Sequence, residues 1–150
     1  MTYYERITYL IGEYNQLSTY LYSNAVKLIT ILNNESKFDK EDISSSLNKF
    51  EFDSSIEYKK YLELSLVDKT NYFSLLPLNV QKKLKESIKE QNYLNNLFYI
   101  EYDNGFEHEN VQIYNKAIDE LLNKNQNLTS LNSQITKLLD KITKKLTSYK

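Results

Sequence analysis

The chain has 150 residues, a formal net charge of −1 at neutral pH, no cysteine and one histidine. This length suits a single domain with its own core, and the lack of cysteine excludes disulfide frameworks, thiolate metal sites and cysteine nucleophiles. A nearly neutral chain has no general attraction for nucleic acid, and no stretch approaches the ~20 consecutive apolar residues of a membrane span.

Two glycines and one proline are few helix breakers for a chain of this length, which favours long helices over strands and turns. Residues 3–33 form the first predicted helix. Its apolar positions between Ile7 and Ile31 alternate in steps of three and four, which places them on one stripe together with Asn24. Gly12 lies in the middle, where glycine costs about 1 kcal/mol relative to alanine. It marks either a close helix crossing or a tolerated weak position.

Residues 34–54 are expected to form a polar connection that contains a short helix. Asp39 would cap that helix, because a carboxylate before the first turn accepts a free backbone N–H. Its apolar face would consist of Ile43, Leu47 and Phe50.

A further helix is predicted to begin at Ser54, since Ser54 and Glu57 have the capping-box spacing. The alternation of apolar and polar residues over 58–67 is also compatible with a strand. We prefer a helix, because neither a hairpin turn nor a pairing partner lies nearby in the sequence.

Pro77 suits the first turn of the next helix, where its missing N–H has no hydrogen bond to lose. Apolar residues then lie on one face as far as about Tyr102. The tripeptide at 103–105 is predicted to end this helix, with Gly105 in the left-handed conformation of a helix C-terminus.

The last predicted helix, about 107–147, has the strongest periodicity. A strict heptad pattern extends from residue 111 to residue 149, interrupted only by Asn125 and Asn132. At 1.5 Å per residue this helix would be roughly 60 Å long, whereas a compact domain of this size is roughly 40 Å across. The bundle is therefore elongated, or the helix breaks within 123–133, or it projects and pairs with another chain. We expect a packed and continuous helix.

Asparagine in an apolar seam commonly fixes register, because sliding would leave its amide unpaired. Asn24 on the first helix is the expected partner of Asn125. If the first and last helices run antiparallel, their paired residue numbers sum to about 149. This register would also bring together Glu5 with Lys144 and Glu13 with Lys137.

The only histidine, His108, lies among the carboxylates of Glu101, Asp103, Glu107 and Glu109. One histidine cannot supply the two Glu-x-x-His motifs of a di-iron bundle, and the EF-hand spacing is absent. Acidic residues in the first turn of a helix are in any case favoured by its dipole. Without cysteine or a glycine-rich phosphate loop, we predict no catalytic residue, no cofactor and no metal.

Two lysine-rich stretches, 82–89 and 137–150, have the composition of a surface for nucleic acid or another polyanion. The net charge of +5 over 121–150 is balanced by −5 over 101–120. We therefore expect ordinary solvated faces and no nucleic-acid partner.

Tyrosines are concentrated in the first predicted helix and cannot all share its buried face with Tyr14. Some must be exposed or must pack on another helix, and tyrosine is enriched at protein interfaces because it combines a large area with a polar tip. These N-terminal tyrosines are Tyr3, Tyr4, Tyr9, Tyr20 and Tyr22. The candidates for interaction or register are Tyr4, Tyr9, Tyr20, Tyr22, Asn24, Asn125 and Asn132.

These features predict an all-α, elongated up-down bundle of about four helices in a single domain, 1–150. The predicted function is a non-enzymatic module that binds a partner protein along a helical face, as an adaptor, an inhibitor or an export chaperone does. The alternative is a structural protein that forms a coiled-coil homodimer through residues 111–149. Neither a membrane span nor a small-molecule substrate is indicated. The first ten residues lack the pattern of a signal peptide, so we expect a cytoplasmic protein.

Overall fold

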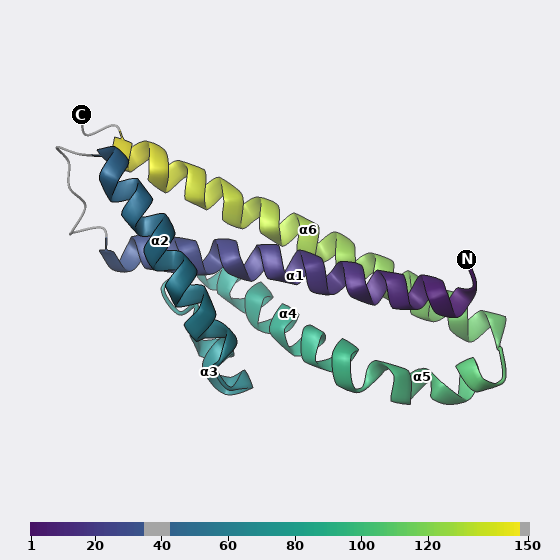
Figure 1. Cartoon of the computed structure of the whole chain (residues 1–150). Coiled ribbons are helices and arrows are strands. Elements are labelled where there is room, and N and C mark those ends of the chain that lie inside the picture. The colour runs from purple at the N-terminus through teal and green to yellow at the C-terminus, as the bar shows by residue number, and fades with distance from the viewer. Residues whose placement is uncertain (35–42, 148–150) are drawn as a thin grey trace.

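The computed structural model describes residues 1–34 and 43–147, apart from the side chains at 43–47, 52, 104 and 147. This part of the chain contains helices and no strand (Figure 1). The helices are α1 (Tyr3–Asn34), α2 (Ile43–Leu62), α3 (Leu66–Asn71), α4 (Leu78–Asn96), α5 (Phe98–Glu107) and α6 (Val111–Thr147). The predicted elongated all-α bundle with long first and last helices is confirmed, and α6 is continuous through 123–133.

The two long helices, α1 and α6, lie side by side and run in the same direction (Figure 1). Tyr3 stacks on Tyr114, and Asn24 bonds to Asn132, so partner numbers rise together along the pair. The predicted antiparallel register is therefore wrong. Glu5 and Glu13 belong to the half of α1 that lies beside the beginning of α6, far from the lysines at the end of α6.

The shorter helices explain why α6 returns parallel to α1. Helix α2 runs antiparallel to the second half of α1, where Lys27 and Glu51 form an ion pair of 3.1 Å. Helix α4 runs antiparallel to the first half, where the Tyr14 hydroxyl donates to the Ser87 carbonyl at 3.0 Å. Both α2 and α4–α5 run opposite to α1, so together they bring the chain back once to the end where α1 begins. Helix α6 starts from that end and therefore runs parallel to α1.

One apolar core joins the helices. The seam predicted for the last helix faces α1 and is mostly buried, while Val111 at its start is exposed and Tyr149 lies outside the described residues. The buried members of the seam are Tyr114, Ile118, Leu121, Asn125, Leu128, Ile135, Leu139 and Leu146. Since these side chains are already buried within the chain, the seam of α6 needs no second chain to cover it.

Helix α2 is one continuous element from Ile43 to Leu62, so the predicted separate short helix and the start at Ser54 are wrong. Ser54 is an interior residue whose Oγ donates to the Glu51 carbonyl at 2.9 Å. A serine that bonds to its own helix in this way does not cap a new one. Asp39, the predicted cap, lies outside the described residues.

The junction of α5 and α6 also differs from the prediction. Gly105 has no left-handed backbone and lies inside α5, whereas Glu109 adopts a φ of 51°. The Asn110 N–H donates to the Gly105 carbonyl at 2.9 Å and the Glu109 N–H to the Phe106 carbonyl at 3.1 Å. These are the two bonds of a Schellman motif, which ends α5 at Glu107 with a glutamate where glycine is usual.

Gly105 is required by close packing. A Cβ atom added at Gly105 would lie 2.4 Å from Cγ2 of Ile113, well inside van der Waals contact. A Cβ added at Gly12 would meet nothing within 4 Å, so Gly12 marks no helix crossing. The two glycines therefore have opposite roles although both lie inside helices.

Alanine at these two positions should shift stability in opposite directions. Gly12→Ala should raise the free energy of unfolding by about 1 kcal/mol, because helix propensity improves and nothing is displaced. Gly105→Ala should lower it by about 1 kcal/mol or more, because overpacking against a branched side chain outweighs the gain in propensity. Urea unfolding of the two variants beside the wild type measures both changes. A stabilised Gly105→Ala variant would contradict the packing of α5 on α6.

Tyr61 is buried at the end of α2, and its hydroxyl has no hydrogen-bond partner among the described residues. Its ring packs against those of Tyr22, Tyr72 and Phe73. Burial raises the pKa of Tyr61 far above 10, the ordinary value for tyrosine, and the neighbouring tyrosines raise it further. The core therefore holds this side chain only in its neutral form.

Tyr61→Phe should raise the free energy of unfolding at pH 7 by about 1 kcal/mol, because it removes an unsatisfied polar group and loses no hydrogen bond. It should also reduce alkaline destabilisation. Because the pKa of Tyr61 is higher in the folded than in the unfolded protein, Tyr61 does not lower the free energy of unfolding below pH 10. Above pH 10 the free energy of unfolding falls, since Tyr61 ionises in the unfolded chain but stays neutral in the folded one. Between pH 10 and 11 the free energy of unfolding of the variant should therefore fall less steeply than that of the wild type, by up to about 1.4 kcal/mol per pH unit. Urea unfolding at pH 7, 10 and 11 measures this, with exposed Tyr9→Phe as the control at pH 7.

Candidate interaction surface

The asparagines of the seam connect α1 to α6 within one chain. Asn24 Nδ2 donates to Asn132 Oδ1 at 3.1 Å, so the predicted pairing of Asn24 with Asn125 is wrong. Asn125 is buried and donates from Nδ2 to the backbone carbonyl of Leu10 at 3.2 Å, while its Oδ1 has no partner in the described part of the chain. These amides therefore fix the register of α1 on α6.

A double-mutant cycle should detect the bond between Asn24 and Asn132. Changing both residues to alanine should cost less than the two single changes together, by about 0.5–1.5 kcal/mol, because the second change removes an amide that has already lost its partner. The same cycle with Asn24 and Asn125 should give additive changes. Free energies of unfolding in urea provide the measurement, and coupling of Asn24 to Asn125 alone would contradict the observed register.

The tyrosines of α1 divide into exposed and buried side chains. Tyr3, Tyr4, Tyr9 and Tyr20 are exposed, as the prediction of an aromatic surface requires. Tyr22 is buried against α4, where its hydroxyl lies 3.0 Å from Ser87 Oγ, so it is one of the tyrosines that pack on another helix. Burial raises the pKa of Tyr22 well above its usual range. It is therefore a core residue.

Tyr9 and Tyr20 lie on one outward face of α1, with 61 % and 56 % of their surfaces exposed. They are eleven positions apart, about three helical turns, which places them in line roughly 16 Å apart. Gly12 and Gln16 are exposed on the same face, and the empty space above Gly12 leaves bare backbone between the rings. We call Tyr9, Gly12, Gln16 and Tyr20 the tyrosine strip.

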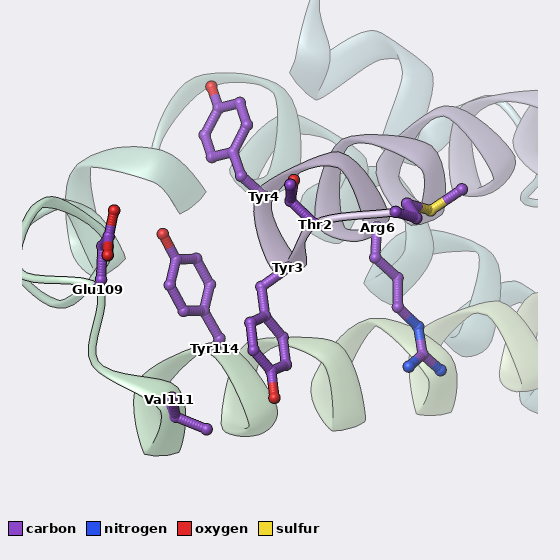
Figure 2. Close-up of a pocket in the computed structure, with 8 residues that line it drawn as sticks. Thr2, Tyr3, Tyr4, Arg6, Glu109, Val111 and Tyr114 are labelled. Atoms are coloured by element: carbon purple, nitrogen blue, oxygen red, sulfur yellow. The ribbon is translucent and has the colours of Figure 1, made fainter.

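An open pocket of about 650 Å³ lies where α1 begins beside the α5–α6 turn. In Figure 2 the Tyr3 ring lies against Tyr114, and Arg6 and Glu109 lie on opposite sides of these rings. The centroids of Tyr3 and Tyr114 are 5.3 Å apart and their planes differ by 12°. This end pocket therefore combines flat aromatic walls with one positive and one negative side chain. Its lining residues are Met1, Thr2, Tyr3, Tyr4, Arg6, Glu109, Val111 and Tyr114.

Aromatic stacking continues from the end pocket into the core. Tyr114 stacks on Phe106 at 4.8 Å, and Phe106 stacks on Tyr102 at 5.6 Å. Tyr102 donates its hydroxyl to a carboxylate oxygen of Glu120 at 2.5 Å. Burial raises the pKa of Tyr102, and the Glu120 carboxylate raises it further, so the hydroxyl remains a donor at neutral pH. The column joins α1, α5 and α6 and gives the pocket an ordered wall.

His108 and its neighbours Glu107 and Glu109 are exposed at the α5–α6 turn. In residues 1–34 and 43–147, no group of three or more histidine or carboxylate side chains is arranged to hold a metal ion. No helix of the described residues is long and apolar enough to cross a membrane.

Sequence reasoning missed part of this surface. Arg6, Glu109 and Tyr114 line the end pocket although they are distant in sequence and form no motif. The sequence drew attention to Gly12, but without the neighbouring helices an exposed glycine cannot be distinguished from one at a close helix crossing. The comparisons with protein families, curated proteins and solved structures found no match to this chain.

Proposed function

We propose that this protein is a non-enzymatic protein–protein interaction module that binds a partner protein along the outer face of α1. One observation carries the proposal: every exposed tyrosine in the described part of the chain lies on α1, whereas the tyrosines of the other helices are buried or half-buried. Tyrosine provides large contact area with little loss of side-chain entropy, and it is enriched at the centres of interfaces.

The dimensions of the surface suit such a partner. The end pocket, which begins at Tyr3, and the tyrosine strip, which ends at Tyr20, together extend over about 26 Å of helix, with Tyr3 facing α6 and Tyr4 facing α5. A standard interface buries about 800 Å² on each partner, which is a patch of comparable width. The end pocket adds the charges of Arg6 and Glu109, which can orient a partner and exclude wrong ones. An extended or helical segment of the partner would lie along the tyrosine strip and end in this pocket.

The alternative proposal, a homodimer through residues 111–149, has less support. The seam that would form the coiled coil is mostly buried against α1, α4 and α5 of the same chain, and Val111 and Leu122 are the large apolar side chains that α6 leaves exposed in the described range. A dimer through the seam would have to displace α1. Sedimentation of the purified protein distinguishes the two proposals, because the seam dimer requires a concentration-dependent increase in mass.

The tyrosine strip can be tested by removing its rings. The tagged protein is purified from its own organism with its bound partners, as the wild type and as Tyr9→Ser combined with Tyr20→Ser. We expect one stoichiometric partner with the wild type and at least a tenfold loss with the double variant, since central aromatic residues of an interface each contribute about 2 kcal/mol or more.

The matched control is Ile100→Ser combined with Leu122→Ser, which changes two exposed apolar side chains on α5 and α6. Equal recovery of the partner by both double variants would contradict binding along α1. Thermal unfolding shows that each variant is folded.

A further inference from the structure

A second exposed surface lies at the corner formed by the end of α2, the short helix α3 and the start of α4. Five aliphatic side chains are exposed there, including Val67 at 66 % and Leu78 at 81 %. Figure 1 shows α3 and the end of α2 projecting away from the long α1–α6 pair. We call this surface the aliphatic corner: Leu62, Leu66, Val67, Leu75 and Leu78.

The backbone of the corner is held by local hydrogen bonds. Ser65 Oγ accepts the Asp68 N–H at 3.2 Å and caps α3. Gln81 Nε2 donates to the Ser74 carbonyl at 2.9 Å and so ties the α3–α4 connection to α4. Phe73 and Leu76 of the same connection are buried in the core. The exposed aliphatic side chains therefore project from an anchored segment.

A row of lysines continues from the corner along α4. Leu78, Lys82, Lys85 and Lys89 are spaced by four, three and four residues, which places them on one helix face over about 16 Å. The core residues of α4, among them Leu84, lie on the opposite face. In the described part of the chain no carboxylate forms an ion pair with these lysines.

The charge of this region opposes that of the whole protein. Residues 59–89, which include the whole lysine row, contain seven lysines and three carboxylates, a net charge of +4, although the complete chain carries −1. The acidic side chains are Glu63, Asp68 and Glu86, and all three are exposed. An apolar surface surrounded by excess positive charge is complementary to a layer with anionic groups outside and hydrocarbon beneath.

The composition favours a lipid surface over a protein. Leucine and valine are under-represented among the energetically dominant residues of protein interfaces, and lysine is depleted there. The same two classes of residue are the usual ones in segments that lie at an anionic membrane interface, where apolar side chains enter the acyl boundary and lysines contact headgroups. The tyrosine strip on α1 has the opposite composition.

We propose that the aliphatic corner and the lysine row of α4 dock this protein on the surface of an anionic phospholipid bilayer. The side chains of Val67 and Leu78 enter the outer edge of the hydrocarbon, and Lys82, Lys85 and Lys89 contact lipid phosphates and carboxylates. Docking is peripheral and reversible, and it leaves the tyrosine strip to a protein partner. The proposal rests on a different surface from the proposed function.

The first test is co-sedimentation of the full chain with vesicles. Vesicles of phosphatidylcholine alone are compared with vesicles in which one third is phosphatidylserine. We expect binding to the anionic vesicles only. Lys82→Gln combined with Lys85→Gln should weaken binding about 25-fold, at about fivefold for each lysine near the surface. Val67→Ser combined with Leu78→Ser should weaken it at least tenfold.

Matched variants elsewhere separate this site from general adsorption and from the tyrosine strip. Lys137→Gln combined with Lys141→Gln removes the same charge from α6, and Tyr9→Ser combined with Tyr20→Ser removes exposed rings from α1. Both should bind vesicles like the wild type. If the two lysine pairs have equal effects and the corner variant has none, binding is non-specific adsorption and the proposal is wrong.

A second test follows insertion directly, because the chain contains no tryptophan. Val67→Trp should shift its fluorescence to the blue with anionic vesicles and be quenched by lipids brominated on their acyl chains. Ile100→Trp, at a similarly exposed position on α5, should show neither change. Unchanged fluorescence of Val67→Trp would overturn the proposal.

Other occupants of the corner give distinct outcomes. No vesicle binding, together with self-association that Val67→Ser and Leu78→Ser abolish, would assign the corner to a second copy of this chain. No vesicle binding, together with a co-purifying protein that the same variant loses, would assign it to a protein partner. Either result would replace the membrane proposal.

Discussion

The other helices are arranged around the apolar seam between α1 and α6. Two helices of 32 and 37 residues bury their stripes against each other, and α2 and α4 then pack on α1. Because the pair is parallel, the chain has to return once between its ends, and α2 followed by α4–α5 provides that path. The return covers one side of α1 only, which is why an outward face carrying Tyr9 and Tyr20 stays open to solvent.

Polar groups inside this seam specify one arrangement. Asn24 with Asn132, and Asn125 with the Leu10 carbonyl, can bond only in the parallel register that the structure adopts. A one-turn slip would break these bonds and leave the buried Asn125 amide without a partner, which costs more than the loss of an exposed hydrogen bond. The asparagines therefore act inside one chain. They select one alignment of α1 and α6, whereas leucine packing alone would allow several alignments.

The same residue type takes opposite roles at different places in the fold. Tyr14 and Tyr61 fill the core, where burial raises their pKa well above the usual range for tyrosine, while Tyr9 and Tyr20 face solvent. The exposed side chains are also sorted by chemistry. Among the described residues the exposed tyrosines lie on α1, while five exposed leucine and valine side chains lie at the α2–α3–α4 corner beside the lysine row of α4. Our two proposals rest on this difference in composition.

The all-α class, the long first helix and the long continuous last helix could be predicted from the amino-acid pattern, because apolar spacing of three and four residues persists through each helix. The sequence also indicated that some tyrosines of the first helix are exposed. Tertiary structure decided the direction of α6, the partner of Asn24, the burial of Tyr22 and the continuity of α2. It also decided the α5–α6 turn, where Gly105 serves a close contact with Ile113 and Glu109 takes the left-handed backbone. Periodicity shows which face of a helix is buried, but the neighbour that covers it depends on contacts between residues far apart in the chain.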